Sequence, residues 1–101
     1  MKYMKADPIL LLKIGGEGGF IEIYQEGDVY VYHSDESALK DLLSEEDAKD
    51  IEFDSRERFA SLEDAISRVN IGALKNGTIT YINDDMAFEI KLLIHQRVKD
   101  L

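Results

Sequence analysis

The chain has 101 residues and a net charge of −9, with 45% hydrophobic residues, 33% charged residues and no cysteine. This length and composition predict one folded domain, residues 1–101, and exclude a disordered chain. The acidity argues against direct nucleic-acid binding, and the lack of cysteine excludes disulfides and thiolate chemistry, as in a cytoplasmic protein.

Three strands are predicted in the N-terminal third. The first is the run 9–14. Its uninterrupted apolar part, residues 9–12, is too short for a signal peptide or a membrane span, so we expect no membrane association. Residues 20–25 and 28–33 alternate in residues of high β propensity. The glycine-rich turn 15–19 and the pair Glu26-Gly27 join these runs. Connections this short allow only antiparallel neighbours, which predicts a three-stranded meander.

The side-chain period of two within each strand predicts two different faces for this meander. The aliphatic face, expected to be the core, carries Ile21, Ile23, Val29 and Val31. The other face carries Phe20, Glu22, Tyr24, Tyr30 and Tyr32. Its three tyrosines would form a contiguous aromatic surface with Phe20, and tyrosine is enriched at protein interfaces. The alternative is that a helix covers this face or that it is a half-exposed sheet surface.

An acidic segment follows the meander. Residues 35–64 hold twelve acidic and four basic residues, a net charge of −8, and they include Glu45, Glu46 and Asp47. A localised acidic field speeds encounter with a positive surface, so we expect a protein partner with a basic surface. The alternative is a solvated face that keeps a small protein soluble.

The same segment should contain short elements. Ser34 or Asp35 can cap a helix over 36–43, and Ser44 can cap a second turn at 45–47. Residues 51–53 read as a short strand on a wet sheet edge.

The C-terminal part predicts two helices and a strand. Ser61 caps a helix with an apolar stripe at Leu62, Ala65, Ile66 and Val69. A strand is expected at 78–82. A last helix is expected over 85–99, with an apolar stripe that can extend to the end of the chain: Met86, Ile90, Leu93, Ile94, Val98 and Leu101. The element order β-β-β-α-β-α-β-α predicts an α+β fold, a mainly antiparallel sheet that starts with a three-stranded meander and has helices packed on one face.

Neither the glycine-rich turn nor the histidines predict an active site. A phosphate loop needs a helix after it, whereas this turn leads into a strand and places Glu17 at its tip. His33 lies near Asp35 and Ser37, which resembles a nucleophile–base–acid set, but capping is the usual role at a strand-to-helix junction. Lysines flank His95 one turn away on each side, and no carboxylate cluster has the calcium-loop pattern. We therefore expect no enzyme, no catalytic residue, no cofactor and no metal.

Three segments carry a resemblance to known proteins. These are the run Lys13-Ile14-Gly15-Gly16-Glu17-Gly18-Gly19-Phe20-Ile21-Glu22-Ile23-Tyr24, the run Ser34-Asp35-Glu36-Ser37-Ala38-Leu39 and the run Ser61-Leu62-Glu63-Asp64-Ala65. Together they resemble a group of small, acidic, uncharacterised bacterial proteins that open with an I-G-G-E-G-G hairpin turn. Phe20 stands where that group usually has serine, and the C-terminal third differs. The resemblance implies the fold and a bacterial origin, and it carries no assigned activity.

The expected function is a non-enzymatic protein-binding module, immunity- or antitoxin-like, whose partner contacts come from Glu45, Glu46, Asp47, Tyr24, Tyr30 and Tyr32. One alternative is a homo-oligomer, such as a homodimer, with a structural or regulatory role. A further alternative is a small ligand-binding or hydrolytic domain around the glycine turn and His33.

Overall fold

The computed structural model describes residues 7–16, 19–49 and 54–99. It contains a five-stranded sheet with the order β4-β3-β2-β1-β5, in which all neighbours are antiparallel. The strands are β1 (Ile9–Gly16), β2 (Gly19–Glu26), β3 (Val29–Asp35), β4 (Asp54–Phe59) and β5 (Thr78–Ile82). The predicted α+β class and the three-stranded meander are confirmed.

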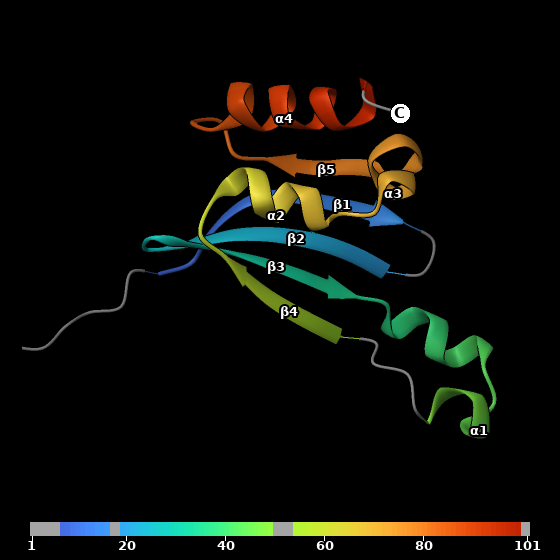
Figure 1. Ribbon diagram of the computed structural model, residues 1–101. Helices are drawn as coiled ribbons and strands as arrows, with labels where there is room; N and C mark the ends of the chain where they lie inside the picture. The colour runs from blue at the N-terminus through green and yellow to red at the C-terminus, as the bar shows by residue number, and fades with distance from the viewer. Residues whose placement is uncertain (1–6, 17–18, 50–53, 100–101) are drawn as a thin grey trace, which may run out of the picture.

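Three helices lie on one face of this sheet (Figure 1). They are α2 (Leu62–Arg68), α3 (Ile71–Asn76) and α4 (Ala87–Lys99). α2 packs on β3 and β4, α3 packs on β1, and α4 packs on α2 and α3. The Arg97 guanidinium links α4 to α2 by donating to the carbonyl oxygens of Ile66 and Val69, at 2.8 and 3.1 Å. None of the described helices is long and apolar enough to cross a membrane.

Two short elements, the 3₁₀ helix η1 (Ser37–Leu42) and α1 (Glu45–Ala48), separate β3 from β4. We name residues 36–49 the acidic arm. In Figure 1 the arm projects from the end of the sheet, away from α2 and α4. The expected helix over 36–43 is thus present as a 3₁₀ helix, and the predicted strand at 51–53 lies outside the described residues.

Short polar side chains start the helices where the sequence indicates. Ser44 accepts a hydrogen bond from the Asp47 backbone N–H, and Ser61 accepts one from that of Asp64, both at 3.1 Å. These bonds satisfy backbone donors that have no partner within the helix. Asn70 caps α3 in the same way, through the Gly72 N–H at 2.7 Å. α3 was not predicted, because a helix of one or two turns has too few residues to show a period.

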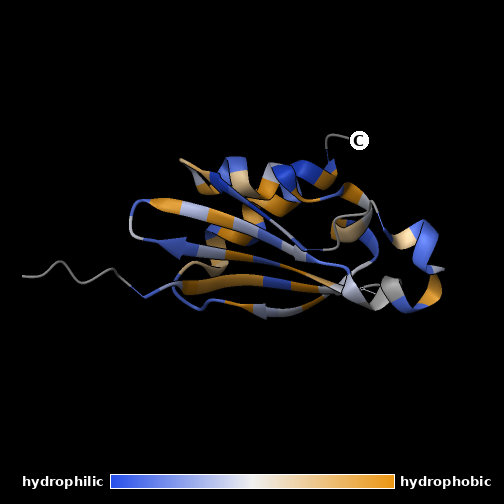
Figure 2. Ribbon diagram, turned by 90° about the horizontal axis from the view of Figure 1, so that it is seen from below, coloured by the Kyte–Doolittle hydropathy of each residue, from blue (hydrophilic) through white to orange (hydrophobic). Residues whose placement is uncertain are grey.

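The core lies between the helices and the sheet. Figure 2 shows hydrophobic residues where the helices face the strands and hydrophilic residues on the outer helix surfaces. The central cluster includes Ile23 from β2, Ile66 from α2 and Ile90 from α4, which are all at most 1% exposed. Four further residues of the stripe predicted for α4 pack against this cluster: Met86, Leu93, Ile94 and Val98. Leu101 lies outside the described residues.

The face assignment predicted for the meander is wrong for β3. In the observed register Ile23 lies opposite Tyr32, and Tyr24 lies opposite Val31. Directly opposed residues of an antiparallel pair point to the same side of the sheet. The two-residue turn Gly27-Asp28 pairs each odd-numbered residue of β2 with an even-numbered residue of β3. The prediction instead placed the odd-numbered residues of both strands on the same face. The helix-covered face therefore carries Tyr30 and Tyr32, and the far face carries Tyr24 and Val31.

Candidate functional site

The expected tyrosine surface does not form. Tyr32 is 4% exposed and belongs to the core, and the Arg68 guanidinium lies 4.8 Å above its ring. Tyr30 is half-buried and packs against the same core. Tyr24 is on the far face of the sheet, so the three side chains share no surface. The alternative expectation, that a helix covers this face, accounts for the burial of Tyr30 and Tyr32.

The acidic arm exposes the other predicted partner contacts. Glu45, Glu46 and Asp47 are all exposed on α1, in the first turn, where the helix dipole favours negative charge. Leu42, at the end of η1, is 79% exposed, and the neighbouring Leu43 is 38% exposed. The structure therefore brings three carboxylates and two leucines together on a segment that projects from the body.

Asp35 fixes the base of this arm. Its carboxylate accepts a 2.9 Å hydrogen bond from the Ser37 backbone N–H, which starts η1. The side-chain and backbone hydrogen bonds from Ser37 lower the pKa of Asp35. Ser37 therefore serves as the partner of Asp35, which agrees with the capping role expected for this junction.

A polar cluster occupies the far face of the sheet. We name Glu22, His33, Asp35 and Asp54 the His33 cluster. His33 is 6% exposed and Glu22 is 8% exposed. His33 Nδ1 lies 3.1 Å from Glu22 Oε1, and His33 Nε2 lies 3.0 Å from Asp54 Oδ1. One donor atom each from His33, Asp35 and Asp54 lie within 4.8 Å of one another.

Strand register creates this cluster. Glu22 on β2 is directly opposite His33 on β3, and Asp35 on β3 is directly opposite Asp54 on β4. Both pairs point to the far face because residues two apart in a strand share a side. Both ring nitrogens of His33 are bonded to carboxylates, so the suspected set of His33, Asp35 and Ser37 does not have catalytic geometry.

Sequence reasoning missed Glu22 and Asp54 as partners of His33. Glu22 lies eleven residues before His33, and Asp54 lies twenty-one residues after it. One signal was available for Glu22, a charged residue between the apolar Ile21 and Ile23 in a strand expected at the centre of the meander. Nothing local indicates Asp54, since the partner strand β4 was not predicted at 54–59.

Aromatic and basic side chains border the His33 cluster. The Phe20 ring meets the His33 ring edge-to-face, with 5.8 Å between centroids. Lys13 Nζ lies 4.5 Å from the Phe20 centroid and 3.8 Å from Glu22 Oε2. Arg56 lies opposite His33 on β4 and is exposed. The buried carboxylate of Glu22 therefore lies close to two side chains that can donate a hydrogen bond to it, Lys13 and His33.

Tyr24, beside Glu22 on the far face, should ionise at a higher pH than a free tyrosine. Burial raises its pKa, and the hydrogen bond and charge of Glu22 raise it further. Its contribution to folding stability is therefore present below about pH 10, the usual tyrosine pKa, and is lost as pH rises through the folded-state pKa. The ultraviolet titration of the protein minus that of Tyr24→Phe isolates this phenol, and a midpoint at or below that of free tyrosine would contradict the expectation.

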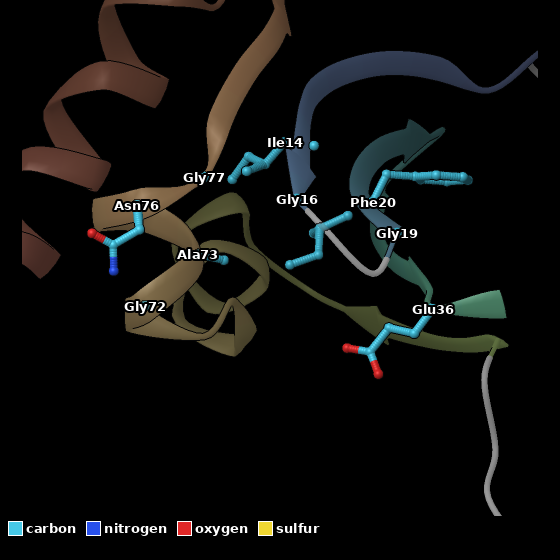
Figure 3. Close-up of a pocket in the computed structure, with 11 residues that line it drawn as sticks. Ile14, Gly16, Gly19, Phe20, Glu36, Gly72, Ala73, Asn76 and Gly77 are labelled. Atoms are coloured by element: carbon cyan, nitrogen blue, oxygen red, sulfur yellow. The ribbon is translucent and has the colours of Figure 1, made fainter. Parts of the chain in front are cut away.

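A cavity of about 430 Å³ lies beside the glycine turn. Gly16 and Gly19 from the hairpin line one side, and Gly72, Ala73 and other residues of α3 line the opposite side (Figure 3). Glu36 points its carboxylate into the same region, whereas the Phe20 ring extends away from α3. Glu36 is the one charged residue among the described lining, and His33 does not line the cavity. The described walls thus hold no nucleophile beside a base, which gives the hydrolytic alternative no support here.

Comparison with protein families, with curated proteins and with solved structures found no match to this chain.

Proposed function

We propose that the protein is a cytoplasmic, non-enzymatic binding module, immunity- or antitoxin-like, that holds a protein partner with its acidic arm. The observation that supports this most is the exposure of Leu42 (79%) next to three exposed carboxylates, Glu45, Glu46 and Asp47. An apolar side chain at the centre of a patch supplies burial energy, and surrounding charges select the partner and speed encounter. The complementary surface is an apolar depression bordered by lysine or arginine.

The position of the arm supports the same proposal. It leaves the end of the sheet and projects away from α2 and α4 (Figure 1). In Figure 2 the arm is mainly hydrophilic, with a hydrophobic stretch on its outer side. One ion pair lies within the described arm, between Lys49 Nζ and Glu46 Oε1 at 3.6 Å, and both side chains remain largely exposed. Exposed pairs of this kind contribute little to stability, so these charges are available for a partner.

Neutralising the arm should weaken capture of the partner. The triple change Glu45→Gln, Glu46→Gln and Asp47→Asn removes three charges from α1 and leaves the Ser44 cap, which uses the Asp47 backbone N–H. Recovery of a basic protein from host lysate, and its measured affinity, should fall about tenfold or more, because each lost attraction at an interface is worth roughly 0.5–1 kcal/mol. The binding of the unchanged protein should also weaken as ionic strength rises.

A matched control removes the same number of charges elsewhere. Asp84→Asn, Asp85→Asn and Glu89→Gln change three exposed residues near the start of α4. This variant should retain the affinity of the unchanged protein. Equal losses of affinity in both triple variants would show that binding depends only on net charge. No loss of affinity in either variant would exclude the arm as the binding surface. Capture of a second copy alone would favour the homo-oligomer instead.

A further inference from the structure

We propose that the His33 cluster binds one divalent transition-metal ion, with His33, Asp35 and Asp54 as ligands and Glu22 as the group that orients the histidine. The reaction of the site is simple coordination: His33 Nε2 and the two carboxylates each donate a lone pair. The site is separate from the acidic surface of α1, and the inference does not depend on the proposed function.

The hydrogen bonds of His33 leave Nε2 in position to act as a metal ligand. A neutral imidazole has one N–H, and Nδ1–H is the natural donor to the buried carboxylate of Glu22, 3.1 Å away. His33 Nε2 then presents a lone pair to Asp54 Oδ1 at 3.0 Å. A metal ion placed between these two acceptors takes a lone pair from each.

Asp35 supplies the third donor atom of the site. Asp35 and Asp54 are directly opposed on neighbouring strands, and opposed like charges destabilise a sheet. A metal ion is shared by all three donor atoms, which lie within 4.8 Å of one another. Donors of a tetrahedral zinc site lie roughly 3.4 Å apart, so modest side-chain rotation closes the site.

The surroundings have the features of a histidine-based site. A carboxylate that accepts the other ring N–H of a metal-bound histidine fixes the tautomer and raises ligand basicity, and Glu22 is placed for this role. The Phe20 ring packs edge-to-face on His33 and restricts its rotation. One imidazole and two carboxylates suit Zn²⁺ and its neighbours better than Ca²⁺ or Mg²⁺, which take oxygen ligands. The side chain of Asp54 is 57% exposed, so a fourth position is open to water.

The test is a titration of the full-length protein, freed of any histidine tag, with Zn²⁺ and with Co²⁺. We expect one equivalent to bind saturably, with tetrahedral Co²⁺ absorption. The chain has two histidines, and His95 on α4 is exposed, which makes it an internal control. Zn²⁺ should shift the ring ¹⁵N signals of His33 and leave those of His95 unchanged.

Two variants locate the ion. Asp54→Asn should weaken Zn²⁺ binding by more than about tenfold, and Glu22→Gln, which retains an oxygen acceptor for Nδ1–H, should weaken it less. Asp84 is exposed and lies just before α4, so the control variant Asp84→Asn should bind Zn²⁺ with the affinity of the unchanged protein. Because Asp54 is exposed and begins an edge strand, its variant should stay folded, which circular dichroism checks. The proposal is overturned by the absence of saturable binding, by equal affinities of Asp54→Asn and Asp84→Asn, or by shifts at His95 alone.

Discussion

Replacing Ile23 by alanine should lower the free energy of unfolding by about 2–5 kcal/mol, the range for removing a fully buried aliphatic side chain. Ile23 is 0% exposed, and it sits in β2, the central strand, where it faces the helices. Truncation leaves a cavity that rigid neighbours on both sides cannot fill. Since a domain of this size has a total stability of about 5–15 kcal/mol, the loss is a large share.

Urea denaturation followed by far-ultraviolet circular dichroism measures this effect, because the chain has no tryptophan to report by fluorescence. Ile23→Val should cost only about 0.5–1.5 kcal/mol and gives a value even if the alanine variant does not fold. Leu42→Ala is the exposed control, and it should change stability by less than about 0.5 kcal/mol. An Ile23→Ala variant as stable as Leu42→Ala would refute the placement of β2 at the centre.

Replacing Gly19 by alanine should cost about 1–3 kcal/mol, the usual range for forced overpacking. A Cβ on Gly19 would overlap the carbonyl oxygen of Asp35 and lie 2.8 Å from the Glu36 Cα. Both obstacles are backbone, so no side-chain rotation relieves them. The strand ends of β2 and β3 must separate, and Asp35, a proposed metal ligand and the residue that starts η1, must move with them.

Gly16→Ala is the matched control for this prediction. It changes a glycine at the other end of the same turn, where an added Cβ meets nothing closer than the Gly19 carbonyl oxygen at 4.0 Å. Its stability should be equal to or slightly above that of the unchanged protein, because alanine restricts the unfolded chain. Thermal unfolding of both variants makes the comparison, and equal melting temperatures would show that β2 does not approach Asp35 this closely.

Local chemistry made much of the fold predictable. Several signals act within a few residues, and each marks the observed end or start of a strand or helix. They are the glycine turn, the turn at Gly27 and the helix caps at Ser44 and Ser61. The stripe of α4 is also local, because a period of 3.6 repeats over more than three turns. β4 was missed because it alternates exposed charges and half-buried residues, which is typical of an edge strand and gives a weak hydrophobic signal.

The candidate sites also divide into a part that the local sequence predicts and a part that it does not. Exposed Glu45, Glu46 and Asp47 follow from an acidic segment with a short helix, so the arm was predictable as a charged surface. The tyrosine surface was not, because the face of each tyrosine depends on the register of its strand. A shift of one residue moves every side chain of a strand to the other side, and only the turn and the core together set that register.

By itself, the sequence determined the α+β class, the meander, the acidic middle and the helix starts, because each depends on residues close together in the chain. Tertiary structure alone decided that Tyr32 is buried, that β5 returns beside β1 and that Glu22, His33, Asp35 and Asp54 meet on one face. Pairing between strands fixes these contacts, and pairing depends on the free energy of the whole sheet rather than on any one segment.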